Sequence, residues 1–440
     1  MRQNGLPMTP IQRLVAAAAA LLTVLMLLVL GLRSAGAPIG LGASVSPSPS
    51  QRSTASASPP ASPSASSQAS PVSAQDVEAA LASIEAQVQQ IRGLPPAEIS
   101  PAQIINRDQL AVELRALFDA KYPQAQRDAD NITLRSLGLL GANQDVAQLQ
   151  LRLLGNQVLG FYDNRKKRMV VVSDSGLSAE ARITYAHEYT HALQDAAFTL
   201  KKLQTDAVGE DDRSLARTAL VEGDATETMF LWALAGNLDP GELAQLGAAP
   251  LPDTGDAPSW MVSLLRFPYT TGLQWVGRVY QEGGFKAVDA AFSDPPSSTE
   301  QVIHYDKWVA REKPIAVTVP DLAPALGNGW RRVASSPQGE AMMGVMLQFF
   351  GVSQADAARA VAGWGGDRVA VYAGPGASFS LAWRLSWDSP TDAREFAEAY
   401  ARVIGKLPFP ARLVSLSATE QLVVHASSDA LLETTLAAAR

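Results

Sequence analysis

The chain has 440 residues, a hydrophobic content of 47% and a net charge of −7. That length allows two or three domains with cores of their own, and the acidic balance argues against a nucleic-acid partner. The chain contains no cysteine. Disulfides, cysteine nucleophiles and thiolate metal sites are therefore excluded, and any metal ion must be bound by His, Asp or Glu.

The N-terminus combines basic residues with a long apolar run. Arg2 and Arg13 precede the uninterrupted apolar segment Leu14–Leu32. As a helix this segment is about 28 Å long, close to the thickness of the bilayer core. We expect a transmembrane signal anchor at 14–32 that leaves residues 1–13 in the cytoplasm and places the rest of the chain outside it, at the cell membrane. The alternative is a signal peptide cleaved near Ala37, which gives a secreted protein.

Residues 33–74 are dominated by Ser, Pro and Ala. Such a composition has little apolar surface to bury, so it predicts a disordered linker that holds a folded part away from the membrane. Folding is expected to begin near Gln75. Apolar residues at helical spacing predict helices over 75–92, 107–120, 128–140 and 144–155.

A change of pattern follows these helices. The β-prone segments 158–162 and 169–172 flank Asp163-Asn164, which is typical of a turn, and together they predict a hairpin. Ser178 is a favourable N-cap for the next helix, expected over 179–197. If this helix carries an active site, a strand of the hairpin beside it can serve as an edge strand that pairs with an extended substrate. An ordinary structural hairpin is the equal alternative.

This helix carries the sequence His187-Glu188-Tyr189-Thr190-His191, which has the form H-E-x-x-H. Residues four apart lie on one face of a helix, so two imidazoles at this spacing can bind one zinc ion. Glu188, beside them, is placed to act as the general base. The chain has only four histidines, so two of them at this spacing around a glutamate are unlikely to be accidental.

A catalytic zinc site needs a third protein ligand, and Glu222 is the best candidate. It lies within the apolar helical pattern of 213–236, where a carboxylate is costly unless it is paired or bound to metal. Asp224 and Glu227 are its rivals. Zinc-bound histidines also need an acceptor that fixes the ring, and we expect Asp195 or Asp224 in that position.

Other polar residues further along the chain are candidates for supporting roles. His304 and Tyr269 are candidate donors to the oxyanion that forms during amide hydrolysis. For His304 an ordinary structural role is the alternative. His425 lies in a strand pattern far from the motif and is predicted to be structural.

The C-terminal segment, from residue 331 to 440, predicts a small α+β unit. Strands are expected at 369–372, 378–387, 412–417 and 421–425, with helices at 392–404 and 430–439. Gly365-Gly366 predicts a tight turn, with a cation site at Asp367 as the alternative. The predicted fold class is therefore α+β, with a mainly helical part over 75–330 that contains a small sheet, followed by this C-terminal unit.

The metal motif resembles that of the gluzincins, zinc metallopeptidases that combine H-E-x-x-H with a downstream glutamate. The spacing is longer than in thermolysin, a familiar gluzincin. Thr226 stands where that protein has an acid four residues after the third ligand. The resemblance therefore implies a zincin-like metallopeptidase domain over 75–330, with zinc bound by His187, His191 and Glu222. It does not carry over the residues that support the ligands.

A closer likeness is to a bacterial family of membrane-anchored predicted metallopeptidases. It covers roughly residues 90–390, and no substrate comes with it. The similar sequence segments are 157–163 (QVLGFYD), 187–195 (HEYTHALQD), 221–225 (VEGDA), 267–269 (FPY), 298–301 (STEQ) and 363–368 (GWGGDR).

The sequence thus predicts a zinc-dependent endopeptidase outside the cytoplasm, acting on a peptide or protein substrate. One alternative is a catalytically inactive relative that serves as a surface binding or scaffold module, although such a protein has no need of Glu188. A second alternative is a structural zinc site, which requires a fourth protein ligand. The sequence does not indicate an oligomeric state.

Overall fold

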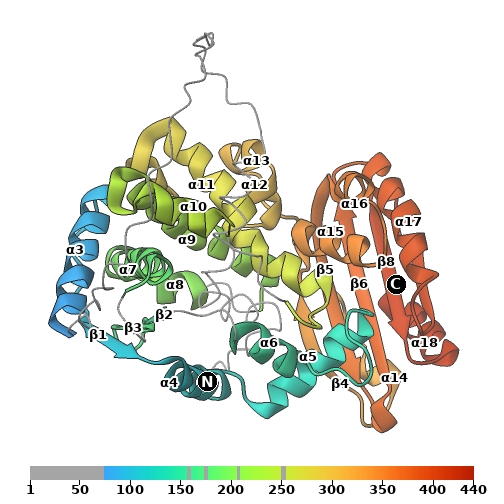
Figure 1. Cartoon of the computed structure of the whole chain (residues 1–440). Coiled ribbons are helices and arrows are strands. Elements are labelled where there is room, and N and C mark those ends of the chain that lie inside the picture. The colour runs from blue at the N-terminus through green and yellow to red at the C-terminus, as the bar shows by residue number, and fades with distance from the viewer. Residues whose placement is uncertain (1–73, 156–159, 173–176, 206–208, 249–253) are drawn as a thin grey trace, which may run out of the picture.

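The structure is a computed structural model that describes residues 74–440 apart from 156–159, 173–176, 206–208 and 249–253 (Figure 1). The anchor predicted at 14–32 and the linker up to residue 73 lie outside this range. None of the helices within it is long and apolar enough to cross a bilayer. Over the described residues the fold is a mixed α+β arrangement, mainly helical, with two sheets.

The first part of the chain is mostly helical, and the four helices predicted before the hairpin are all present, the third displaced toward the N-terminus. Its elements are α3 (Ala74–Arg92), α4 (Arg107–Lys121), α5 (Gln124–Ser136), α6 (Val146–Gly155), α7 (Ala179–Phe198), α8 (Leu200–Thr205), α9 (Asp211–Trp232), the π-helix η1 (Ala233–Asn237), α10 (Pro240–Ala248), α11 (Ser259–Ser293), α12 (Thr299–Ile303) and α13 (Tyr305–Val309).

The predicted hairpin is confirmed by β2 (Gly160–Asp163) and β3 (Arg168–Val172), which pair antiparallel. The structure adds a strand that the sequence did not predict, β1 (Ser100–Ile105), which pairs parallel with β3. The strand order is β1-β3-β2, so β2 is an edge of this sheet. The same strand packs against α7.

Helix α7 is a central helix of this part of the fold. Ser178 caps it as predicted, accepting a hydrogen bond from the backbone N–H of Ala181, and Thr199 ends it in the left-handed conformation. Every residue from Ile183 to Asp195 is buried. A helix that is buried on all sides needs a partner for each polar side chain it carries, and α7 carries the whole H-E-x-x-H motif.

Helices α9 and α11 cross at a pair of glycines. A Cβ on Gly223 would lie 2.6 Å from the carbonyl oxygen of Gly272, and one on Gly272 would lie 2.5 Å from that of Ala219. Any side chain at either position would force the two helices apart. The contact fixes Glu222 of α9 against the stretch of α11 that contains Tyr269.

The C-terminal unit contains a five-stranded sheet in the order β4-β5-β6-β8-β7, and every strand pair in it is antiparallel. The strands and helices predicted there from the sequence are present, and β4, α14, α15, α16 and η2 are additional. The elements are α14 (Ala323–Leu326), β4 (Arg331–Ser336), α15 (Gly339–Phe349), α16 (Gln354–Val361), β5 (Trp364–Ala373), the 3-10 helix η2 (Pro375–Ala377), β6 (Phe379–Trp387), α17 (Pro390–Ile404), β7 (Ala411–Ser415), β8 (Glu420–Ala426) and α18 (Asp429–Ala439).

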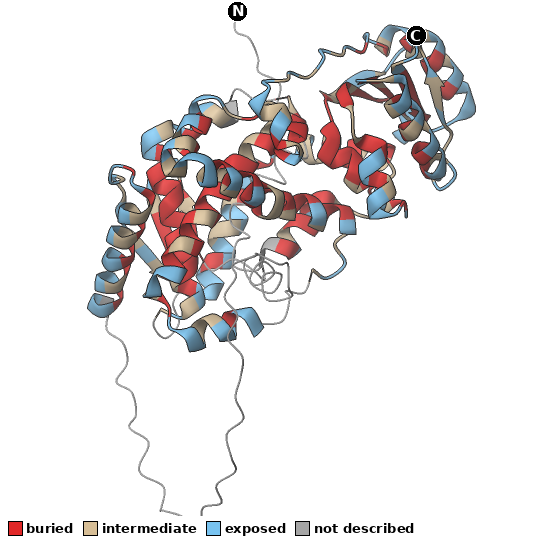
Figure 2. Cartoon of the chain, turned by 90° about the horizontal axis from the view of Figure 1, so that it is seen from above, coloured by how far each residue is buried: buried red, intermediate tan, exposed pale blue. Residues whose placement is uncertain are grey.

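Alternate residues of this sheet enter two different hydrophobic clusters. Val369 and Val371 of β5 pack with α15, α16 and α17, whereas Ala370 and Tyr372 pack with α18. The first of these clusters continues into α9, α11 and α6, so the C-terminal unit and the helical part share a core. Figure 2 shows the buried residues concentrated along the central helices and the large sheet.

The predicted turn at Gly365-Gly366 is wrong, because both glycines lie within strand β5. A Cβ on Gly366 would lie 2.3 Å from the carbonyl oxygen of Ile315, whose own N–H donates to Gly365 at 2.7 Å. The glycines therefore allow close approach of a neighbouring backbone segment. Asp367 accepts hydrogen bonds from backbone N–H groups at the start of α15 and from the indoles of Trp364 and Trp383, so its carboxylate is already satisfied by neutral donors.

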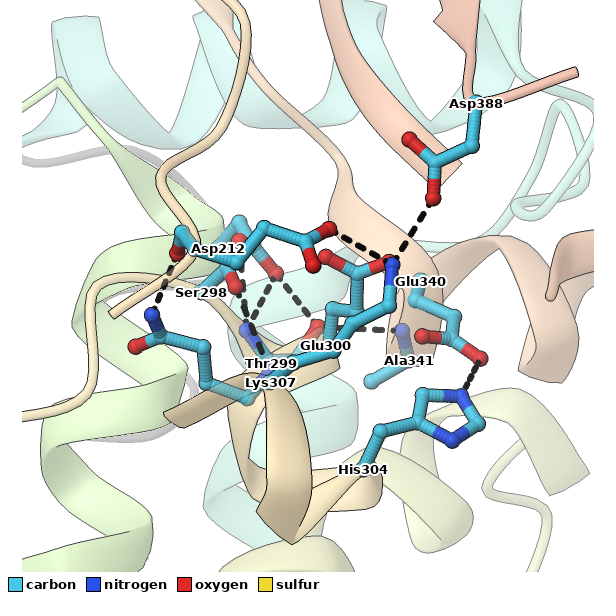
Figure 3. A network of polar contacts seen from close by, with 11 residues as sticks. Asp212, Ser298, Thr299, Glu300, His304, Lys307, Glu340, Ala341 and Asp388 are labelled. Carbon is cyan, nitrogen blue, oxygen red and sulfur yellow. Dashed lines mark hydrogen bonds and ion pairs between the residues drawn. The ribbon is translucent and has the colours of Figure 1, made fainter. Parts of the chain in front are cut away.

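A network of polar contacts joins α9 and α12 to the C-terminal unit (Figure 3). Asp212, buried near the start of α9, accepts from the backbone N–H of Thr299 at 3.1 Å and from its hydroxyl. The ammonium of Lys307 lies 2.6 Å from Glu300, 2.7 Å from Glu312 and 2.8 Å from Asp388. The segment Ser298-Thr299-Glu300-Gln301 thus belongs to a structural junction.

Candidate metal centre

Three side chains from α7 and α9 bring their donor atoms together in the interior. Nε2 of His187 lies 2.9 Å from Nε2 of His191 and 3.2 Å from Oε2 of Glu222. The distance from His191 Nε2 to the same carboxylate oxygen is also 3.2 Å. All three residues are buried and form one of the two groups of potential metal ligands in the described part of the chain.

This triangle fits a tetrahedral zinc ion. With zinc–ligand bonds of about 2.0–2.1 Å, two ligand atoms of a tetrahedron are about 3.3 Å apart, close to the three observed separations. The donor set, two imidazoles and one carboxylate, is one that catalytic zinc sites use. Asp224 and Glu227, the rival ligands, are not part of the group.

Burial and mutual contact set the charges of the three ligands. Burial lowers the pKa of His187 to about 4, so its ring is neutral at ordinary pH and Nε2 is available as a lone-pair donor. Burial alone would raise the pKa of Glu222. The adjacent His191, together with the contact to His187, lowers it instead, so the carboxylate is ionised. Burial alone would lower the pKa of His191, but the charge of Glu222 raises it to about 9, so a metal ion that binds this ring would displace a proton. With that proton displaced, the site presents two imidazoles and one negative charge.

Glu188 lies beside the triad and is held by the small sheet. Its Oε2 accepts a hydrogen bond of 2.9 Å from the backbone N–H of Tyr162 in β2. Its Oε1 is buried and has no hydrogen-bond partner. Burial raises the pKa of this carboxyl to about 8, and the nearby His191 partly opposes that shift. One oxygen is thus fixed in place, while the other has no hydrogen-bond partner among the described residues and the carboxyl has a raised affinity for a proton.

Tyr269 of α11, predicted from the sequence as a candidate donor, lies at this site. Its ring centroid is 6.4 Å from that of His187, and its hydroxyl donates to Glu222. Burial and the carboxylates of Glu222 and Glu188 raise the pKa of the phenol well above its usual value. The hydroxyl therefore remains protonated and serves as a hydrogen-bond donor.

Gln194, which the sequence did not single out, fixes the orientation of His191. Its Nε2 donates to the carbonyl of Val221 at 2.9 Å and to Asp224 at 2.8 Å. Because both of these partners are acceptors, the amide oxygen must face His191, 2.8 Å from Nδ1. Nδ1 then carries the proton, and Nε2 of His191 is free to bind a metal ion.

Asp224, predicted as an acceptor for a histidine, acts through Gln194 instead of directly. It forms a buried ion pair of 2.8 Å with Arg92 at the end of α3. The same guanidinium lies 2.7 Å from Asp289 and stacks on the ring of Phe285. The polar contacts behind His191 thus run through Gln194 and Asp224 to Arg92, which the sequence did not indicate as part of a site.

Asp195, the other predicted acceptor, has different partners. It accepts from the hydroxyl of Tyr162 at 3.2 Å and pairs with Lys167. Both partners belong to the β2–β3 hairpin, so Asp195 joins α7 to the sheet. The place predicted for it is taken by Gln194, three residues after His191, because α7 turns Asp195 toward the hairpin.

His304 does not join the triad either. Its Nε2 lies 2.9 Å from Glu340 in the junction of Figure 3. That junction contacts α9 at Asp212, ten residues and therefore about 15 Å along the helix from Glu222. The second potential metal group, Glu300, Glu312 and Asp388, belongs to the same junction and already surrounds the ammonium of Lys307.

His425 is structural, as predicted. Tyr400 lies 2.8 Å from its Nε2 and the carbonyl of Ser136 lies 2.8 Å from its Nδ1. Burial lowers the pKa of this histidine to about 4. It therefore joins α5 to the C-terminal sheet as a neutral side chain.

Known families and structures match only part of this chain. The sequence model of a family described as "Domain of unknown function (DUF8575)" matches residues 328–430, within the C-terminal unit and outside the triad. No curated protein matches the chain. A solved structure from Chloroflexus aurantiacus, described as a "putative hydrolase with a novel fold", is similar over 53% of this chain and 87% of that chain, at 16% identity and a TM-score of 0.36.

Proposed function

We propose that the chain is a zinc metallopeptidase, with His187, His191 and Glu222 as ligands and Glu188 as the general base. The observation that carries the proposal is the convergence of three buried donor atoms beside a second carboxylate, that of Glu188, which has one oxygen without a hydrogen-bond partner among the described residues. Zinc held in such a site supplies a Lewis acid, which polarises a carbonyl and lowers the pKa of water. Attachment to the membrane through residues 14–32 is part of the same proposal.

The residues of the chain have separate tasks in this reaction. Glu188 accepts a proton from the attacking water on Oε1 and passes it to the leaving amine, while the N–H of Tyr162 keeps Oε2 in place. The hydroxyl of Tyr269, which donates to Glu222, turns to donate to the negative charge that develops on the carbonyl oxygen. Gln194 keeps His191 in the tautomer that binds metal.

The edge strand β2 supports a peptide as the substrate. In an antiparallel pair, successive residues point their N–H and C=O groups alternately toward and away from the partner strand. Tyr162 points its N–H away from β3 and toward Glu188, so this edge of β2 runs beside the general base. An extended peptide that pairs with this edge would have its backbone next to the reacting groups.

The ligand count favours a catalytic site over a structural one. A structural zinc site needs four protein ligands, whereas the group in the described part of the chain has three. The fourth position of a tetrahedron is then left for water or substrate. Retention of Glu188, which is not a ligand, also argues for the enzyme over a binding module.

The test is a cleavage profile of the full chain, loaded with zinc, on a proteome-derived peptide mixture. The matched control is Glu188→Gln, which keeps the size of the side chain and its hydrogen bond to Tyr162. We expect the wild-type protein to cleave peptides and the variant to lose cleavage while retaining stoichiometric zinc. Equal cleavage profiles for the two proteins would reject the peptidase function and support a catalytically inactive scaffold module.

A further inference from the structure

Arg266 of α11 is a partly buried arginine whose guanidinium forms no hydrogen bond or ion pair within the described residues. Burial lowers its pKa, and no carboxylate opposes that shift. Two other partly buried arginines each pair with a glutamate: Arg168 with Glu113 and Arg368 with Glu210, both at 2.7 Å. A partly desolvated cation without a counter-charge is unfavourable, so the protein gains if a ligand supplies the anion.

The position of Arg266 on α11 places it next to the metal centre. It precedes Tyr269 by three residues, so the two Cβ atoms are neighbours on the helix surface, about 5–6 Å apart. Leu273 follows Arg266 by seven residues, which returns to nearly the same face of the helix. Leu273 belongs to a hydrophobic cluster that includes residues of α3, α7 and α9, and the Tyr269 ring lies beside His187 of α7, so this face of α11 is directed toward the motif.

Three residues lie at successive turns along this face, and their surroundings differ. Leu273 is buried in the core, Tyr269 contacts the triad, and Arg266, one turn nearer the start of α11, is partly exposed to solvent. A molecule bound at the triad and extending along α11 toward its start meets the guanidinium next. A planar guanidinium with free N–H groups recognises carboxylates through paired hydrogen bonds.

We infer that Arg266 forms an anion subsite beside the metal triad and that the preferred substrates are peptides with a carboxylate near the cleaved bond. This inference rests on the proposed function, because it names a substrate class for the same site. The carboxylate has two sources in a peptide, the side chain of Asp or Glu and the free C-terminus.

The experiment uses the full chain loaded with zinc and a peptide that the wild-type protein cleaves. Four versions of that peptide are compared: with Glu or Gln near the cleaved bond, each with a free or an amidated C-terminus. We expect kcat/KM to be about tenfold or more higher for the versions with the recognised carboxylate, and the four versions show which source is used. Arg266→Gln should abolish the preference. The control Arg278→Gln, which changes an exposed arginine of the same helix paired with Glu282, should keep it.

A binding measurement separates this inference from the proposed function. Fluorescence anisotropy of the labelled peptides is recorded with Glu188→Gln, alone and combined with Arg266→Gln. If the wild type cleaves peptides but its preference is unchanged by Arg266→Gln, the subsite is rejected and the peptidase stands. If nothing is cleaved, the peptidase is rejected, and labelled Glu and Gln peptides with either C-terminus are used instead. Weaker binding of the carboxylate peptides after Arg266→Gln then supports the subsite, and equal binding rejects it.

Discussion

Gln194 and His191 form a hydrogen bond of 2.8 Å in which the amide oxygen accepts and the imidazole Nδ1 donates. A neutral amide thus does what a carboxylate does in many zinc sites. The carboxylate of Asp224 lies one step further away, 2.8 Å from the amide nitrogen, and is neutralised by Arg92. The negative charge closest to the metal position is therefore Glu222.

The first prediction concerns this amide. Gln194→Ala removes the acceptor of His191 and should lower zinc affinity by about 10–100-fold, because the ring is no longer held in one tautomer and orientation. The measurement is competition with a chromophoric chelator, together with the visible spectrum of the cobalt-substituted protein, which reports ligand geometry.

The matched control is Gln87→Ala. Gln87 accepts a hydrogen bond of 2.8 Å from the indole of Trp232 and has no contact with the triad. This variant should bind zinc as the wild type does and show the same cobalt spectrum. An unchanged zinc affinity in Gln194→Ala would mean that packing alone orients His191.

The second prediction concerns Tyr269. Tyr269→Phe removes a hydroxyl from the metal centre and leaves the ring in place, so zinc binding should be preserved. We expect kcat to fall about 100-fold with little change in KM, because the donor acts on charge that develops in the transition state. Tyr305→Phe is the control, since that hydroxyl donates to Glu282 away from the site. A kcat equal to that of the wild type would restrict Tyr269 to a structural role.

The sequence predicted the parts of the site that depend on local spacing. His187, Glu188 and His191 follow from the period of a helix, and Glu222 from a carboxylate in an apolar helical pattern. Gln194 was missed because a carboxylate is the usual partner of a zinc-bound histidine, although its position three residues after His191 was a usable signal. Arg92 was not predictable, because it meets Asp224 across 132 residues of chain.

Contacts between segments far apart in the sequence also explain the other differences between prediction and structure. Tyr269 and His304 are both polar residues in the segment after the motif, and only the packing of α11 and α12 decides which of them reaches the triad. Strand β1 was missed because Ser100-Pro101 is typical of a loop and its parallel partner β3 lies far along the chain. Gly365-Gly366 was predicted as a turn because the segment around Ile315 that approaches it cannot be seen in the sequence.

The third prediction concerns the buried ion pair behind the site. Arg92→Met leaves Asp224 without its cation in the interior and should lower the free energy of unfolding by about 3–5 kcal/mol. Adding Asp224→Asn removes the uncompensated charge and should restore part of that loss. Urea unfolding of the two variants measures both effects. Arg115→Met, which breaks an exposed pair with Asp119, should change little. A double variant less stable than Arg92→Met would contradict this account.

The fourth prediction concerns His304, whose partner is Glu340. The hydrogen bond to Glu340 raises the pKa of His304, against partial burial and the nearby Lys307, while Glu300 adds to the rise. The folded protein therefore keeps a proton that the unfolded chain loses near its ordinary pKa of about 6.5. The resulting stability is fully present below that pH and is lost as pH rises through the raised pKa of the folded state.

Melting temperatures measured from about pH 6 to pH 9 test this assignment. The difference between the wild type and His304→Gln should shrink as pH rises, and Glu340→Gln should show the same loss of pH dependence because it removes the other partner. Zinc content and kcat of His304→Gln should stay close to those of the wild type, since this histidine lies in the junction and not at the triad. A collapse of kcat with zinc still bound would instead return His304 to the role of oxyanion donor that its sequence context predicted.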